Sequence, residues 1–256
     1  MKLDNDTIIL SDLHGCYWTM TRLLNNAPTG LKIVFAGDLI DRGPHSRKVV
    51  EFAMENGIPT TLGNHCDLCL AFYRHKSKCA VMYDRDVWLD NGGCFTTRNW
   101  LISKTNDRRA SHMGAQDDYV GGRVPDPVLD WMAALPAYLL PSSEPDSEGR
   151  QLMVSHTGYG LSANPGTDDW FQALWGRYPD DGPFPEDNYY RVFGHTTVKK
   201  AKVEPRFCNI DTGCAYPKRD GILSAILWPS KTIITQPFNE APIDSNFTVQ
   251  NGCITR

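Results

Sequence analysis

The segment FAGDLIDRG, residues 35–43, places three charged side chains directly after an apolar run. Asp38, Asp41 and Arg42 all fall within five residues. One capping residue satisfies most connections between a strand and a helix, so two carboxylates and a guanidinium are more than the backbone needs. Carboxylates bind metal ions, and a planar guanidinium binds phosphate oxygens through two parallel hydrogen bonds. The segment therefore predicts metal-dependent chemistry on a phosphate group.

Polar clusters follow apolar runs at four other places in the chain: SDLHG at 11–15, GNH at 63–65, SHTG at 155–158 and FGHT at 193–196. A lone Asp after a strand is usually a helix cap, and a lone His is usually a surface or core residue. Five such clusters in one chain favour a shared site instead. Asp12 and His14 are one residue apart, so in an extended segment their side chains point the same way.

The clusters together supply carboxylate, imidazole and amide groups as candidate metal ligands: Asp12, His14, Asp38, Asn64, His156 and His195. This mixture without thiolate suits manganese, iron or zinc, and we expect Mn²⁺. Six protein ligands are many for one ion with an open position, and they suit two divalent ions that share the Asp38 carboxylate. Such a pair of ions binds both the attacking and the leaving oxygen of an in-line displacement, and it lowers the pKa of a bridging water. The ligand set therefore predicts that a metal-bound hydroxide attacks a phosphoester directly.

Three residues beside these ligands fit the same reaction. Arg42 would bind the phosphate oxygens. His65 and Asp41 would form a general-acid pair, because the carboxylate orients the imidazole and raises its pKa, so that the imidazole can protonate the leaving alkoxide.

The elements that must position these residues alternate along the first 65 residues. Apolar runs predict strands at 7–10, 31–36 and 58–62, and helical periodicity predicts helices at 16–27 and 46–56. Short connections in this order give right-handed crossovers and a largely parallel sheet, whose carboxyl edge binds ligands. Further strands are expected at 150–156 and 189–194, followed by an antiparallel meander at 206–216, 221–228 and 231–236.

The length allows one sizeable core or two small domains, and the sequence has no low-complexity linker, so we expect a single domain over residues 1–256. The net charge of −4 argues against a nucleic-acid-binding surface, and no apolar run is long enough to span a membrane. The N-terminal segment lacks the basic region of a signal peptide, so we expect a cytoplasmic protein. Residues 79–125 have no clear period and are expected to form a lid beside the active edge, and a loosely packed tail is expected after residue 236. The oligomeric state is not predicted.

Two of the eight cysteines, Cys66 and Cys69, form a CxxC motif. A zinc or redox site is one interpretation, but the chain has no second CxxC that would complete a zinc site. We favour two small apolar residues one turn apart on a helix.

The motifs DLHG, GDLIDRG, GNH, SHTG and FGHT resemble the five motifs of the calcineurin-like metallophosphoesterases. They are more closely similar to PPP-type serine/threonine phosphatases of the bacterial and phage branch, in order over roughly residues 5–235. The resemblance implies an α/β fold with a two-sheet β-sandwich core flanked by helices, in four layers (α/β/β/α).

The resemblance also implies a role for each site residue. One ion would be held by Asp12, His14 and Asp38, and the other by Asp38, Asn64, His156 and His195. Arg42 would bind phosphate, and His65 would be the acid that Asp41 orients.

Two more segments match the bacterial branch, and one position departs from the family. LWGR at 174–177 nominates Arg177 as a second phosphate-binding arginine, and WLDNGG at 88–93 is shared with that branch. Cys66 stands where the family usually has Glu, which puts the support of His65 and Asn64 in doubt. An exposed thiol at this position would make the enzyme sensitive to oxidation.

The motifs leave the substrate open. We favour a serine/threonine protein phosphatase with broad phosphomonoesterase activity, because the negative net charge offers no general field for a polyanion. The alternative is a hydrolase of dinucleoside polyphosphates, of the diadenosine tetraphosphate type, on the same scaffold. A third hypothesis is a non-catalytic module that binds a phosphorylated partner, against which the intact ligand set argues. The expected partner is a phosphorylated protein or a small phosphoester, with neither nucleic acid nor membrane.

Overall fold

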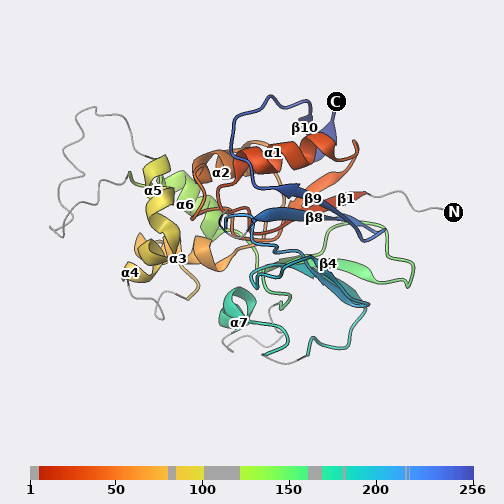
Figure 1. Cartoon of the computed structure of the whole chain (residues 1–256). Coiled ribbons are helices and arrows are strands. Elements are labelled where there is room, and N and C mark those ends of the chain that lie inside the picture. Colours follow the sequence, from red (N-terminus) through yellow and green to blue (C-terminus); the bar gives the residue numbers. More distant parts are fainter. Residues whose placement is uncertain are drawn as a thin grey trace.

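Two mixed β-sheets form the centre of the computed structural model, which describes residues 6–79, 85–100, 122–160, 169–180, 183–216, 218 and 220–256. In Figure 1, helices α1 and α2 lie above the sheet that contains β1, β8 and β9. The sheet that contains β4 lies below it, and α7 lies below that sheet. The predicted α/β fold, a two-sheet core with flanking helices, is confirmed.

The first sheet has six strands in the order β10–β11–β2–β1–β8–β9. Their bounds are β1 Thr7–Leu10, β2 Lys32–Phe35, β8 Ile222–Trp228, β9 Thr232–Pro237, β10 Thr248–Gln250 and β11 Cys253–Thr255. β1 pairs with β2 in parallel, as the short crossover predicts, but pairs with β8 antiparallel.

The second sheet has five strands in the order β3–β4–β5–β7–β6. Their bounds are β3 Tyr138–Leu139, β4 Gln151–Ser155, β5 Tyr189–Phe193, β6 Lys202–Val203 and β7 Phe207–Asn209. β4, β5 and β7 run parallel, so their carboxyl ends share one edge.

The described helices are α1 Tyr17–Asn26, α2 Ser46–Glu55, α3 Asn64–Phe72, α4 Arg85–Trp88, the π-helical turn η2 Leu89–Gly93, α5 Cys94–Asn99, α6 Asp126–Ala133 and α7 Asp169–Trp175. Apolar residues at helical spacing bury the inner face of α1, which the sequence predicts. None of the helices in the described part of the chain has the length and apolar character needed to cross a bilayer.

Successive side chains of β1 point to opposite faces of the sheet, so the strand contributes to two separate apolar clusters. Ile8 and Leu10 point to the helices, whereas Ile9 points between the two sheets, where it joins a buried cluster with Ile226 and Tyr190. Every residue of β1 is fully buried, because helices cover one face of its sheet and the second sheet covers the other. This burial holds the ends of the central strands in fixed positions.

The prediction of one antiparallel meander after residue 206 is wrong. β7 joins the second sheet beside β5, whereas β8 and β9 form a hairpin on the first sheet. The predicted strand at 58–62 is also absent, and only Thr60 makes a parallel bridge, to Phe35. Strand partners depend on contacts between distant segments, which a local apolar pattern does not encode.

The segment after Gln236 is not the loosely packed tail that we expected. Glu240 accepts hydrogen bonds from the backbone N–H groups of Trp18 and Thr19, at 3.1 and 2.9 Å, and so caps the first turn of α1. β10 and β11 then extend the first sheet, and Ile254 is fully buried. Figure 1 shows this segment passing over α1. These hydrogen bonds join distant parts of the chain, so the polar sequence of the segment alone does not predict them.

Only part of the expected lid at 79–125 can be compared, since 80–84 and 101–121 lie outside the described residues. The described middle part, α4 to α5, is helical; α4 and η2 pack against α3, and α5 packs against α2. Cys66 and Cys69 lie fully buried on α3, in agreement with two apolar residues one turn apart.

The packing between the sheets predicts a large stability effect at Ile226. Replacing Ile226 by Ala leaves a cavity between the sheets and should lower the free energy of unfolding by about 2–5 kcal/mol, measured by urea denaturation. The matched control is Ile243→Ala, since that side chain is 37% exposed, and it should change stability by at most about 0.5 kcal/mol. Equal losses in the two variants would contradict the described core.

Candidate active site

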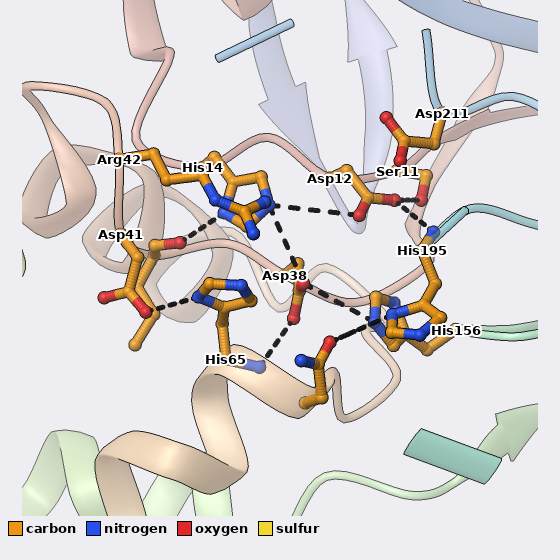
Figure 2. Close-up of polar contacts among 12 residues, drawn as sticks. Ser11, Asp12, His14, Asp38, Asp41, Arg42, His65, His156, His195 and Asp211 are labelled. Carbon is orange, nitrogen blue, oxygen red and sulfur yellow. Dashed lines mark hydrogen bonds and ion pairs between the residues drawn. The ribbon is translucent and has the colours of Figure 1, made fainter. Parts of the chain in front are cut away.

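The five polar clusters meet at the carboxyl ends of β1, β2, β4 and β5, together with the first turn of α3 (Figure 2). The structure brings all six predicted metal ligands to this place: Asp12, His14, Asp38, Asn64, His156 and His195. Most of these side chains are buried, so the polar atoms face one another and not the solvent.

The loops that carry these residues have an unusual backbone. Six of the eleven non-glycine residues with left-handed φ in the described part of the chain belong to the site: Asp12, His14, Asp38, Asp41, Arg42 and His195. This region is unfavourable for side chains with a Cβ and persists only when surrounding contacts impose it. Here the backbone N–H of His14 donates to the Asp38 carbonyl at 2.9 Å, and that of Gly15 donates to Leu39. The two loops therefore hold each other in position.

The first group of metal-binding atoms surrounds His14. Its Nε2 lies 3.7 Å from Asp38 Oδ2 and 4.0 Å from Asp12 Oδ1. Its Nδ1 donates to the Ile40 carbonyl at 2.7 Å, which fixes the tautomer and leaves Nε2 as the acceptor nitrogen within the site.

The second group lies on the other side of Asp38. His156 Nε2 is 3.5 Å from Asp38 Oδ2 and 2.8 Å from Asn64 Oδ1. His195 Nδ1 is 3.1 Å from the same amide oxygen. Asp38 Oδ2 thus lies within 4 Å of an imidazole nitrogen from each group, which is the position that a shared carboxylate requires.

Two glycines allow the carboxylates to approach the backbone. A Cβ at Gly63 would overlap Asp38 Oδ1, and a Cβ at Gly194 would overlap Asp12 Oδ2. Asp38 Oδ1 accepts the His65 backbone N–H at 3.0 Å, and Asp12 Oδ2 accepts that of His195 at 3.0 Å. The glycines of GNH and FGHT are therefore needed for close contact with the neighbouring carboxylate.

The charges of the cluster favour the protonation states that a metal ion needs. Burial opposes ionisation of Asp38, but the adjacent imidazoles, His156 first among them, hold its pKa below the usual value. Burial, with Arg42 nearby, lowers the pKa of His14, and burial with His156 lowers that of His195. The lowered pKa values favour neutral His14 and His195 beside an ionised Asp38, and these are the forms that bind metal ions.

Burial also raises the pKa of Asp12, and the negative charges of Asp211 and Asp38 add to this effect. Like charges buried side by side are unfavourable unless a cation lies between them. His195 Nε2 is buried and has no hydrogen-bond partner among the described residues. Asp12, Asp38 and His156 each offer a ligand atom within 4.8 Å of the others, as do His14, Asp38 and His65. This donor set fits divalent metal ions.

His65 and Asp41 form the pair that the sequence predicts. His65 Nδ1 lies 2.6 Å from Asp41 Oδ2, and the same oxygen accepts the Trp88 indole N–H at 2.8 Å. The Thr96 hydroxyl donates to the other oxygen at 2.6 Å. Burial raises the pKa of Asp41 despite these hydrogen bonds. With Nδ1 held by Asp41, the Nε2 of His65 is the nitrogen left to face the site.

The two predicted arginines differ in their position. Arg42 is half-buried, and its guanidinium contacts His14 Nε2, so an anion bound by Arg42 lies next to the donor set. Arg177 is exposed just after α7. Its charge acts on His195, where it adds to burial and His156 in lowering the pKa.

Sequence reasoning missed several supporting residues. Trp88 and Thr96 donate hydrogen bonds to Asp41. The WLDNGG motif, which begins at Trp88, was the feature of the sequence that could have indicated a role for this segment. Asp211, which follows β7 just as the ligands follow their strands, accepts hydrogen bonds from Thr197 Oγ1 and the Gly213 N–H, both at 2.9 Å. It thereby fixes the loop that carries His195.

Cys66 is fully buried beside Asp38 and Asp41. Burial and the Asp38 charge raise the pKa of its thiol. The exposed, reactive thiol that would cause oxidation sensitivity is therefore not present at this position.

The model of the calcineurin-like phosphoesterase family matches residues 7–208. The chain therefore belongs to this family, as the motifs predict, and is an enzyme that hydrolyses phosphoesters with the help of metal ions.

Similar proteins extend over nearly the whole chain. Bis(5'-nucleosyl)-tetraphosphatase PrpE [asymmetrical] of Bacillus subtilis is 29% identical, over 93% of this chain and 96% of the relative. The protein of the same name from Anoxybacillus flavithermus is 25% identical, over 90% of this chain and 93% of the relative. A crystal structure provisionally named a diadenosine tetraphosphatase has a TM-score of 0.59 at 20% identity, and covers 94% of this chain and 96% of its own. This last similarity supports the fold.

The position of Asp38 between the two groups predicts that one substitution affects two ions. Asp38→Asn should lower the occupancy of both metal sites, because an amide cannot supply a negative oxygen to each. Metal analysis of the purified protein by mass spectrometry, after dialysis against Mn²⁺, measures this.

The control is Asp67→Asn, since Asp67 is an equally buried carboxylate whose oxygens accept hydrogen bonds from residues 77–79, outside the site. If Asp38→Asn retained two ions while its fold was intact, Asp38 would not be shared between them.

Proposed function

We propose that this enzyme hydrolyses dinucleoside polyphosphates, with bis(5'-nucleosyl) tetraphosphates such as diadenosine tetraphosphate as its substrate class. The observation that carries the proposal is the similarity to the tetraphosphatases, which extends over nine-tenths of this chain and of each relative and so includes the loops around the site. The competing hypothesis is the serine/threonine phosphatase activity that we favour from the motifs and the net charge alone.

Two divalent ions, for which we favour Mn²⁺, would be held by the six ligands named above. Ions bound there supply positive charge to the phosphate oxygens and lower the pKa of water. Asp38 holds the two groups of ligands together, and the hydrogen bonds from His14 Nδ1 and His156 Nδ1 to backbone carbonyls orient the imidazoles toward the ions.

The cationic and acidic side chains would act on the substrate. Arg42 binds the phosphoryl oxygens beside the donor set, and the exposed Arg177, whose charge acts on His195, binds phosphate as well. His65 gives a proton to the leaving oxygen, and Asp41 keeps the imidazole in the required tautomer through the 2.6 Å contact with Nδ1. Trp88 and Thr96 hold Asp41 so that it cannot rotate away.

The substrate class is tested by a panel of kcat/KM values on the Mn²⁺-loaded enzyme. Diadenosine tetraphosphate should be preferred over phosphoserine and phosphothreonine peptides by at least about tenfold, and chromatography should show ATP and AMP, the products of asymmetrical cleavage. Asp38→Asn, run in parallel, shows whether each activity comes from this site. A preference for the peptides would favour the protein phosphatase, and no turnover with any divalent ion would favour a phosphate-binding module.

The role of His65 predicts a dependence on the leaving group. A nitrophenolate departs without protonation, whereas a serine alkoxide is far more basic. His65→Ala should therefore slow hydrolysis of a phosphoserine peptide about 10²–10⁴-fold and that of p-nitrophenyl phosphate much less. Asp41→Asn should show the same pattern with a smaller amplitude, because the imidazole remains but is less well oriented.

The quantity to measure is the defect on the serine ester divided by the defect on the nitrophenyl ester, at equal metal content. A ratio near one would mean that His65 only supports the metal ligands, in keeping with its place beside His14 and Asp38, and would exclude the proton-donor role.

A further inference from the structure

Arg42 is held from one side by the π-helical turn η2. The Arg42 backbone N–H donates to the Gly92 carbonyl at 3.4 Å. Gly92 has a left-handed φ of 107°, and a Cβ there would lie 2.8 Å from the Arg42 nitrogen and 3.0 Å from its Cγ. The stem of the arginine therefore packs directly against the backbone of a segment about fifty residues further along the chain.

The guanidinium of Arg42 is held from another part of the chain, by Tyr216. Arg42 Cζ lies 5.3 Å from the centroid of the Tyr216 ring, within the range of a cation–π interaction. Both side chains are half-buried. A guanidinium that rests one face on a ring keeps the N–H groups at its edge free for phosphate oxygens.

Tyr216 belongs to a turn that is itself anchored. The Tyr216 N–H donates to the Gly213 carbonyl at 2.9 Å, and the Gly213 N–H donates to Asp211 at 2.9 Å. Cys214 is buried in the core, and Gly221 lies so close to the carbonyls of Gly213 and Cys214 that a Cβ there would touch both. The ring thus stands on a fixed support, beside the loop that carries His195.

We propose that Tyr216 is a positioning residue, which fixes the guanidinium plane of Arg42 so that its edge faces the phosphoryl group. The inference rests on the proposed role of Arg42 as a phosphate ligand. The edge of the guanidinium touches His14 Nε2, so the orientation that Tyr216 imposes points the donors at the metal-binding atoms. An arginine side chain otherwise loses considerable rotamer entropy on binding, and stacking removes this loss before the anion arrives.

The test uses inorganic phosphate as a competitive inhibitor of p-nitrophenyl phosphate hydrolysis, so that it does not depend on the nucleotide substrate. Tyr216→Leu should raise the inhibition constant of phosphate about 2- to 30-fold, the range of a cation–π contact. Tyr216→Phe should stay within about twofold of the native enzyme, because the ring is retained. The control Tyr138→Leu removes an exposed tyrosine on β3 and should change nothing.

The decisive measurement is a double-mutant cycle. In an Arg42→Ala background, Tyr216→Leu should have no further effect on the inhibition constant, because the ring acts through the guanidinium. An undiminished effect in that background, or a Phe variant as weak as Leu, would overturn the inference. Metal content and circular dichroism, unchanged in each variant, exclude a general loss of structure.

The cycle also separates the two claims. If Arg42→Ala weakens phosphate binding and Tyr216→Leu does not, the positioning role is wrong and the role of Arg42 stands. If Arg42→Ala has no effect on phosphate binding, both are wrong.

Discussion

The site depends on one electrostatic constraint, the burial of the Asp38 carboxylate among three imidazoles. A buried carboxylate stays ionised only if nearby groups stabilise its charge, and here histidines and the His65 backbone N–H do so. The same arrangement keeps the imidazoles of His14 and His156 within 4 Å of Asp38 Oδ2, close enough to share a cation with it. Loops with left-handed residues, glycines without a Cβ and strand ends at one edge all serve to bring these groups together.

A second layer of contacts determines how His65 and Arg42 are oriented. Asp41 holds His65 and is itself held by Trp88 and Thr96, which come from the helical segment after residue 84. The same segment supplies Gly92, against which Arg42 packs. His65, through Asp41, and Arg42 are thus supported by one short stretch of chain, which contains the WLDNGG motif.

The parts that could be predicted from the sequence are those with a local signal. Asp12 and His156 follow apolar runs directly, and parallel strands bring such residues to one edge whatever the rest of the chain does. The partner of β7 could not be predicted, because Phe207–Asn209 is short and apolar enough for either sheet. Asp211 and Trp88 could not be predicted for a related reason. Each supports the site through a hydrogen bond to a residue elsewhere in the chain, and the sequence does not show which residue that is.

The hairpin of β10 and β11 has a consequence for the behaviour of the protein at high concentration. β11 takes up backbone groups of the β2 edge, through Ile33 N–H to Gly252 and Ile254 N–H to Leu31. Without the hairpin, β2 would present an open row of donors and acceptors beside an apolar core, which is a template for pairing between molecules. The hairpin of β10 and β11 therefore protects the enzyme against edge-to-edge aggregation, and the strand left at that margin, β10, is only three residues long.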